Sequence, residues 1–291
     1  MAKHEIQATI IKDSRAMNSR LTTMLLAMPR IILPQFSRYR MLSMNVASMR
    51  AISAAKIRQA VLDDPYIPSA FGAEQVGMSS GSADEVDQKS ARMVWSVAAH
   101  RAVEAHEALE QLGVHKEITN RLLETFAWVT VVATGNERAF RHMIKQRLQT
   151  RDDGTPEAQH DIAILAREIE IALDRSEPEA LYPDEWHLPF VDAMTDVEIE
   201  AEYGLLGEPN GERALRAQHP KLLIAIGRCA RVSYLAHGKR DVRANVDLAL
   251  RLRSMKHPSP FEHVALFDPL SKVTDQNFSK PWVQARKLLG L

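Results

Sequence analysis

The order of polar and apolar residues near the N-terminus predicts a β-hairpin. Polar and apolar residues alternate in residues 4–11, an apolar-rich run follows at 20–28, and residues 13–18 offer a polar turn between them. This pattern is typical of two paired strands that each bury one face. Pro29 should end the second strand and begin a turn or helix, because proline interrupts regular structure.

Most of the remaining chain is predicted to be helical. The expected helices cover residues 47–61, 83–112, 115–124, 136–149, 156–173, 221–230 and 241–255. Residues 126–135 are almost entirely apolar, so periodicity leaves open whether they form a buried strand or a helix. Together these elements predict an α+β fold in which helices dominate.

The chain is expected to form a single domain, residues 1–291, with a Pro-rich acidic excursion at about 176–212. Residues 161–210 hold fourteen Asp or Glu and two Lys or Arg. The segment is either a solvated acidic face or a frame for the basic N-terminal region. Within it, Trp186–Pro189 could be a structural turn or part of a lid.

The overall composition narrows the functional classes. The chain has 37 basic and 37 acidic residues, and its only cysteine is Cys229, which excludes an internal disulfide and a multi-cysteine zinc site. No run approaches about 18 apolar residues, and the first residues do not resemble a signal peptide. We therefore expect a cytoplasmic protein that does not span a membrane.

One segment is strongly basic, although the chain as a whole has no net charge. Residues 12–58 contain nine Lys or Arg and one acid, Asp13. Guanidinium groups match phosphate geometry with paired hydrogen bonds. The short polar side chains of Gln35, Asn45 and Ser48 lie in the same stretch. The combination suits a nucleotide better than a bare phosphate.

Four separated segments resemble the motifs of the flavin-dependent thymidylate synthases. Residues 35–50, Q-x-x-R-Y-R-x7-S-x-R, resemble the R-H-R-x7-S signature. Residues 136–159 carry N-x-R, a later arginine and A-Q, as in the second motif. Residues 230–234 read A-R-V-S-Y, and residues 257–263 read H-P-S-P-F-E-H, similar to the last two motifs.

The order of these segments differs from most family members, in which A-R-V-S-Y and S-P-F-E-H precede the R-H-R signature. The resemblance therefore implies a circularly permuted member. Two positions also depart from the usual pattern: Tyr39 stands where histidine is common, and Val46 where glutamate is common after Asn45. The lost carboxylate leaves the fate of an intermediate open.

The resemblance implies transfer of a one-carbon unit from methylenetetrahydrofolate to C5 of dUMP, with FAD as the hydride carrier and NADPH as its reductant. It also implies a small antiparallel sheet flanked by helices, and a homotetramer whose sites are shared between subunits. The residues carried over for FAD are Arg38, Tyr39, Arg40, Asn136, Arg138, His142, Ser233, His257, Ser259 and Glu262. Those carried over for dUMP are Gln35, Ala47, Ser48, Arg50, Arg121 and Arg147.

Arg147 is the catalytic candidate within that set. It matches the arginine at the uracil edge, where a fixed positive charge would favour the N3-deprotonated ring and make C5 a better nucleophile. Arg50 and Arg121 match the phosphate ligands, although Arg121 lacks the proline of the family motif.

Other interpretations remain beside this one. The same scaffold could make 5-hydroxymethyl-dUMP if water quenched the intermediate, or the basic region could bind nucleic acid, which the zero net charge and few aromatics disfavour. Cys229 could be a nucleophile, but a lone cysteine is usually a small buried apolar residue. His257, Glu262 and His263 could suggest a metal site, yet no further ligand cluster is spaced to complete it, so we expect no metal.

Overall fold

A computed structural model describes residues 4–77, 79–150, 157–234, 241–273 and 277–291 of the chain. The chain has an α+β fold with two sheets. The first sheet has five strands in the order β3-β4-β2-β1-β5. These strands are β1 (Gln7–Ala16), β2 (Ser19–Pro29), β3 (Ser43–Val46), β4 (Trp128–Asn136) and β5 (Glu179–Ala180). All pairs are antiparallel except β1 with β5.

The predicted hairpin is present, but its turn is shorter than expected. The ladder between β1 and β2 continues to the Ala16–Ser19 pair, so only Met17 and Asn18 remain as the turn. The polar residues of β1 stay in the ladder because Asp13 bonds Arg20 and Thr22 across the strands, at 2.7–3.0 Å. Pro29 ends β2, as predicted.

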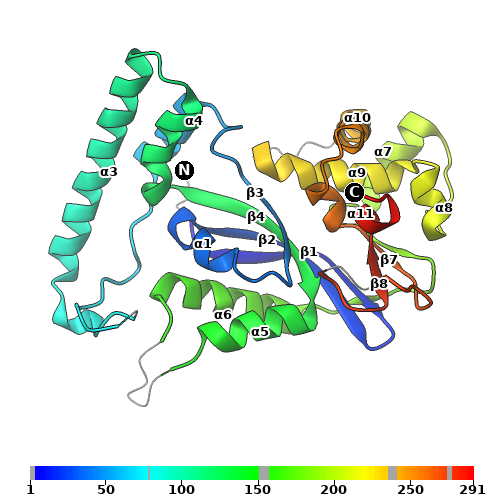
Figure 1. The fold of residues 1–291 in the computed structure, drawn as a ribbon, viewed down its shortest axis with the longest axis horizontal. Coiled ribbons are helices and arrows are strands. Elements are labelled where there is room, and N and C mark those ends of the chain that lie inside the picture. Colours follow the sequence, from blue (N-terminus) through cyan, green and yellow to red (C-terminus); the bar gives the residue numbers. More distant parts are fainter. Residues whose placement is uncertain (1–3, 78, 151–156, 235–240, 274–276) are drawn as a thin grey trace.

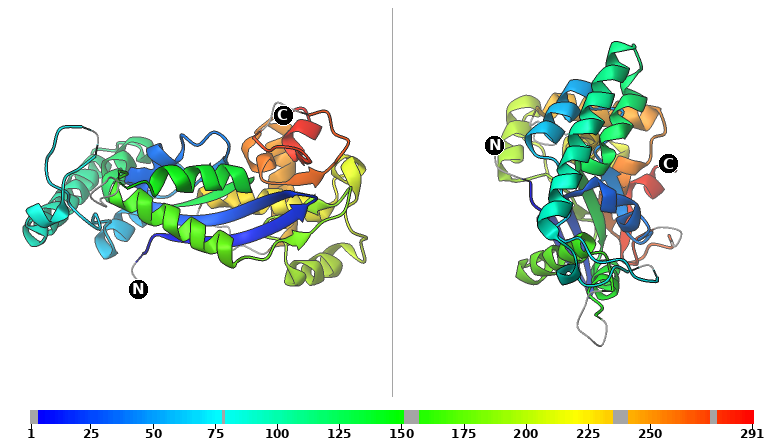
Figure 2. Two further views of the ribbon diagram at one scale, coloured as in Figure 1. Left: turned by 90° about the horizontal axis from the view of Figure 1, so that it is seen from below. Right: turned by 90° about the vertical axis from the view of Figure 1, so that its left-hand side faces the viewer.

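Two helices cover one face of this sheet. They are α5 (Glu137–Arg147) and α6 (His160–Arg175), which lie side by side across the strands (Figures 1 and 2). In α6 the buried side chains of Ile162, Leu165, Ile169 and Leu173 recur with helical spacing. Burial of this apolar stripe attaches the helix to the sheet.

A second group of helices packs at one end of the sheet, where β4 begins (Figure 1). It comprises α2 (Ala54–Asp63), η2 (Ala83–Glu85), α3 (Gln88–Gln111), α4 (Lys116–Thr119) and η3 (Asn120–Phe126). The short elements η1 (Arg30–Ile32) and α1 (Leu33–Phe36) connect β2 to the segment that leads to β3.

The C-terminal part contains a small antiparallel sheet and its own helices. The strands β6 (Trp186–His187), β7 (Ala265–Phe267) and β8 (Trp282–Gln284) pair in that order. The helical elements are α7 (Ala193–Tyr203), α8 (Gly211–Arg216), α9 (Pro220–Arg231), η4 (Val232–Tyr234), α10 (Val242–Ser254), η5 (Ser259–Glu262) and α11 (Ala285–Leu288). Residues 221–230 of α9 are all buried. Gly227 permits the close crossing of α10, since a Cβ there would lie 2.3 Å from the carbonyl oxygen of Asn245.

The structure corrects two predicted elements and decides a third that the sequence left open. Residues 47–53 form turns rather than helix, because other elements hold their backbone: the N–H of Ala47 donates to Thr130, and Asn120 donates to the carbonyl of Met49. The helix expected at 115–124 is divided between α4 and η3. The apolar run at 126–135, whose class was open, is mostly the interior strand β4, which lies between β3 and β2.

The acidic excursion at 176–212 is part of both sheets. It supplies β5 to the larger sheet and β6 to the smaller one. Trp186 and His187 are buried in β6, which contradicts the interpretation of this run as a lid. In the described residues, no helix is both long and apolar enough to cross a membrane.

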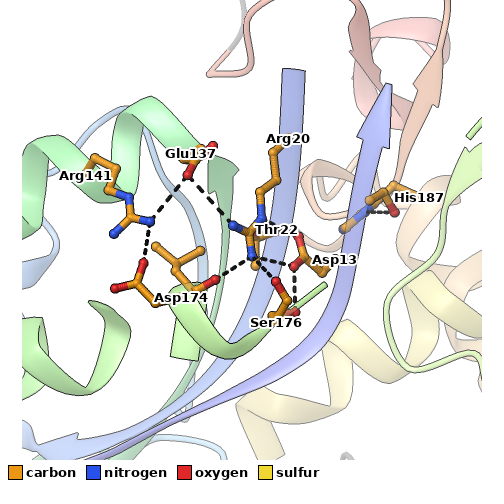
Figure 3. A network of polar contacts seen from close by, with 10 residues as sticks. Asp13, Arg20, Thr22, Glu137, Arg141, Asp174, Ser176 and His187 are labelled. Carbon is orange, nitrogen blue, oxygen red and sulfur yellow. Dashed lines mark hydrogen bonds and ion pairs between the residues drawn. The ribbon is translucent and has the colours of Figure 1, made fainter. Parts of the chain in front are cut away.

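A buried ion pair fastens the hairpin to α6 (Figure 3). The side chains of Asp13 and Arg20 are 4% and 6% exposed, and their two hydrogen bonds form a bidentate pair. Arg20 also donates to the carbonyls of Leu173 and Ser176, and the hydroxyl of Ser176 donates to Asp13. Because each charged group has several partners, this network fixes where α6 ends against β1.

The two sheets meet along a chain of buried polar side chains. His187 is hydrogen-bonded to Ser14 and to Thr23, at 2.9 and 2.8 Å. Thr23 is hydrogen-bonded to Thr134, and Thr134 to His263, at 2.7 and 2.8 Å. Burial lowers the pKa of both histidines, for His263 to about 3. Both rings are therefore neutral in the folded protein at neutral pH.

Candidate functional site

The first candidate site is a cavity of about 550 Å³, named here the Ser48 cavity. Its lining residues are Asn45, Ser48, Arg50, Ala51, His115, Glu117, Ala230, Ser233, Tyr234, Leu252, His257, Ser259 and Pro260. Three of the four motif segments meet here. The N–H of Ser48 donates to the carbonyl of Ser233 at 2.9 Å, and the amide of Asn45 donates to the carbonyl of Cys229 at 3.3 Å.

Arg50 lies at the wall of this cavity and faces a carboxylate. Its guanidinium is 3.6 Å from Glu117, and the two side chains are 66% and 50% exposed. A pair this exposed contributes little to stability. Arg50 is therefore free to exchange Glu117 for an anionic ligand.

The second candidate site is a cavity of about 290 Å³, named here the Tyr39 cavity. It is lined by Arg38, Tyr39, Arg40, Met41, Ala139, His142, Gln146 and Arg147. The turn after α1 supplies the first four residues and α5 the others, because positions 139, 142 and 146 share one helical face. Three guanidinium groups and a histidine line this cavity, and none of the described residues in its lining carries a carboxylate. Its potential is accordingly positive and suits an anionic ligand.

Two buried polar atoms in the Tyr39 cavity residues lack partners in the described structure. They are the hydroxyl oxygen of Tyr39 and the Nε of Arg147. An unsatisfied buried polar group costs free energy, so such atoms are expected to be satisfied when a ligand binds.

A third cavity, of about 640 Å³, lies on the other side of α5 and is named here the Arg138 cavity. It is lined by Met17, Asn18, Ser19, Arg20, Asn136, Glu137, Arg138, Arg141, Pro269, Ser279, Lys280 and Pro281. Asn136 has a structural task at its edge. It caps α5 by accepting from the N–H of Ala139 at 2.9 Å, and it donates to the hydroxyl of Ser279.

Four predicted site residues do not line these cavities. Gln35 donates to Gln159 at 2.9 Å, which joins the first motif segment to the second. Ala47 is buried between strands and turns. Arg121 is half exposed and pairs with Glu124, whereas Glu262 is 18% exposed and pairs with Arg286. Glu262 is thus directed away from the cavities by a tertiary contact, and Arg121 by a partner three residues along its own helical segment.

Sequence reasoning also missed several lining residues. Glu117, Tyr234 and Leu252 line the Ser48 cavity, Gln146 lines the Tyr39 cavity, and Lys280 lines the Arg138 cavity. For Gln146, the sequence did offer a signal, because its neighbour Arg147 in the last turn of α5 was a predicted site residue. Tyr234 is the last residue of the A-R-V-S-Y segment, so that motif was its signal. Glu117, Leu252 and Lys280 have no local signal, because they reach the cavities only through packing between distant elements.

Cys229 is completely buried, and burial raises the pKa of its thiol. A protonated thiol without access to solvent is a poor nucleophile. The structural interpretation of this residue therefore holds. Within the described residues, no group of three or more His, Cys, Asp or Glu is arranged to hold a metal ion.

The chain is an α+β protein with several cavities lined by cationic side chains, which suit anionic ligands. The sequence model of the thymidylate synthase complementing protein family, Thy1, matches residues 14–179, which is more than half of the chain. The chain belongs to this family, which confirms the family resemblance of its motifs. No curated protein matches the sequence.

Solved structures that match this chain include two of the UMP/dUMP methylase PolB from Streptomyces cacaoi. The one bound with 5-Br UMP is 20% identical, covers 60% of this chain and 90% of that chain, and has a TM-score of 0.47. The one bound with 5-Br dUMP is 24% identical, covers 54% and 67%, and has a TM-score of 0.43. Thymidylate synthase ThyX from Helicobacter pylori with FAD and dUMP is 14% identical, covers 53% and 67%, and has a TM-score of 0.36.

The last two motif segments lie outside the matched stretch, at 230–234 and 257–263. In space, the end of the fourth segment lies close to the first part of β2. His263 is hydrogen-bonded to Thr134, and Thr134 to Thr23, at 2.8 and 2.7 Å.

Proposed function

We propose that this chain is a flavin-dependent thymidylate synthase. It would transfer a one-carbon unit from methylenetetrahydrofolate to C5 of dUMP and use NADPH to reduce its flavin. Family membership supports the reaction class. The observation that carries the proposal is the Tyr39 cavity, where Arg38, Arg40 and Arg147 converge and no described lining residue is a carboxylate.

The donor set of this chain fits a flavin dinucleotide. The arginines of the Tyr39 cavity and Arg138 of the neighbouring cavity offer guanidinium groups for a diphosphate. The unsatisfied hydroxyl of Tyr39 and Nε of Arg147 offer further polar contacts. FAD, when bound, would supply the hydride.

The substrate would be held and activated by two arginines of different cavities. Arg50, beside Ser48, would bind the phosphate of dUMP. Arg147 would place a fixed positive charge at the uracil edge and favour the N3-deprotonated ring, so that C5 becomes nucleophilic without a protein thiolate. The burial of Cys229 agrees with a reaction that does not use this thiol.

The division of the substrate residues between two cavities supports a shared site. Arg50 lines the Ser48 cavity and Arg147 the Tyr39 cavity of the same chain. In the homotetramer we propose, the Ser48 cavity of one subunit would face the Tyr39 cavity of another. We also propose that the chain is circularly permuted, which the nearness of His263 to β2 supports.

The first experiment is an absorption spectrum of the protein mixed with FAD and desalted, before and after dUMP is added. The expected result is a retained flavin band that shifts with dUMP, followed by turnover with methylenetetrahydrofolate and NADPH. A colourless protein without turnover would contradict the proposal. Arg147→Ala should retain the flavin and lose turnover.

Sharing of the site is tested by mixing two inactive variants. Arg50→Ala and Arg147→Ala should each lack turnover alone. After subunit exchange, some sites would combine an intact Arg50 from one subunit with an intact Arg147 from another, and activity should return. If activity stays absent although mixed tetramers form, both arginines act within one chain.

The second candidate is a dUMP hydroxymethylase on the same scaffold. Val46, where a glutamate is common in the family, is partly buried and packs against the apolar core, while its neighbour Asn45 lines the Ser48 cavity. The site thus lacks one carboxylate that could affect how the intermediate is quenched. Mass spectrometry of the product distinguishes a methyl from a hydroxymethyl group at C5.

A further inference from the structure

We propose that the ring of Tyr39 is the positioning element for the guanidinium of Arg147. This inference rests on the proposed function and assigns Tyr39 a task within the same site. The central carbon of the guanidinium lies 5.4 Å from the centroid of the Tyr39 ring. That separation is within the range of cation–π attraction.

Arg147 has few other restraints. It is the last residue of α5, and no carboxylate of the described residues forms an ion pair with it. Its Nε is buried without a hydrogen-bond partner. A long, flexible side chain with this environment loses rotamer entropy whenever it is held in one place. The face of the Tyr39 ring is therefore the contact that selects its orientation.

Tyr39 is itself held from the other side. Its ring lies 6.4 Å from that of Phe36, which is completely buried in the core. The backbone of Tyr39 is fixed in the turn after α1, where its N–H donates to Phe36 and its carbonyl accepts from Leu42. The core and the turn therefore hold the ring in one position, and the ring in turn holds the guanidinium of Arg147 at the cavity wall.

The charge of the surroundings explains why an uncharged aromatic ring suits this position. Arg38 and Arg40 flank Tyr39, and His142 and Arg147 face the same cavity. A carboxylate would hold Arg147 more strongly, but it would cancel the positive charge that the uracil edge requires. A tyrosine ring attracts the guanidinium through its quadrupole and leaves the net charge unchanged.

The position of the guanidinium is tested directly by NMR on protein labelled with nitrogen-15 at arginine. The Nε–H signal of Arg147, assigned by its loss in Arg147→Lys, should carry a ring-current shift. Tyr39→Phe should keep this shift, and Tyr39→Leu should lose it, with Tyr39→Met as a second variant if Tyr39→Leu does not fold. An unchanged shift in a folded variant without the ring would overturn the proposal.

Kinetics of the same variants test the consequence. Tyr39→Leu should lower kcat roughly 2- to 30-fold more than Tyr39→Phe does, the range expected for one cation–π contact, with a smaller change in KM for dUMP. It should also move the pH midpoint of kcat upward, because a misplaced Arg147 favours the deprotonated uracil less. Equal losses of kcat in Tyr39→Leu and Tyr39→Phe would overturn the proposal.

The exposed Tyr182 provides a matched control, and Tyr182→Leu should retain both the NMR shift and the turnover of the wild-type protein. A wild-type protein without turnover would instead contradict the proposed function. In that case the NMR shift alone would still show whether Tyr39 contacts Arg147. Failure of the proposed function and failure of this proposal are therefore distinguishable.

Discussion

The N–H of Ser48 donates to the carbonyl of Ser233 at 2.9 Å and joins the first motif segment to the third. This bond is a backbone contact, so it depends on the path of the chain rather than on either side chain. It places the end of α9 against the segment after β3 and forms the wall of the Ser48 cavity. A site that brings together such distant segments depends on the whole fold.

Glu117→Gln should tighten the binding of dUMP. Glu117 is the carboxylate that now pairs with Arg50, at 3.6 Å, and an anionic ligand must displace it. An exposed pair is worth about 0.2–1 kcal/mol, so the Kd should fall by a factor of roughly 1.5 to 5. Calorimetry at low ionic strength measures this change, and Glu104→Gln, which removes the exposed partner of Arg101, is the control. Weaker binding by Glu117→Gln would show that Glu117 helps to hold the ligand.

Arg20→Met should destabilise the protein strongly. The substitution leaves Asp13 buried without its bidentate partner, and an uncompensated buried charge costs about 3–5 kcal/mol of unfolding free energy. Urea denaturation gives the value. The double variant Asp13→Leu with Arg20→Met should lose less stability than Arg20→Met alone. Equal destabilisation by Arg101→Ala, on the exposed pair of α3, would show that burial of the pair is unimportant.

The unfolding free energy should fall as the pH drops below about 6.5. An unfolded histidine takes up a proton near that pH, whereas burial lowers the pKa of folded His263 to about 3, so acid favours the unfolded chain. The stability present above pH 6.5 is thus lost progressively between about 6.5 and 3. Between pH 7 and pH 5 His263 should contribute about 2 kcal/mol to the loss, and His187, whose pKa is also lowered by burial, should contribute in the same direction.

Denaturation of His187→Gln and His263→Gln over this pH range checks the effect, with substitution of the exposed His100 as the matched control. Each buried variant should show a smaller pH dependence than the wild-type protein, whatever its stability at pH 7. If the unfolding free energy depends on pH equally in all variants, groups other than His187 and His263 cause the acid sensitivity.

Cys229 should be inert in the folded protein. Its side chain is completely buried, and burial raises the pKa of the thiol. Iodoacetamide should label it only after urea unfolds the chain, and Cys229→Ala should retain turnover. Rapid labelling of the native protein together with loss of turnover in Cys229→Ala would restore the thiolate as a candidate nucleophile.

The sequence by itself determined the local structure and the family. Alternating residues indicated the hairpin, the acid-poor segment with Arg38, Arg40 and Arg50 indicated an anion site, and four motif segments indicated the family that residues 14–179 confirm. These signals were readable because each depends on residues close together in the chain. Side-chain periodicity and motif spacing are properties of a single segment.

Tertiary structure alone decided how the segments meet. It made the apolar run at 126–135 mostly the interior strand β4, because burial on both faces removes the alternation that identifies a strand. It turned Glu262 toward Arg286, although Glu262 carried a motif signal. It placed Arg50 and Arg147 in different cavities. Such outcomes follow from packing and charge pairing between segments far apart in sequence, which no local pattern records.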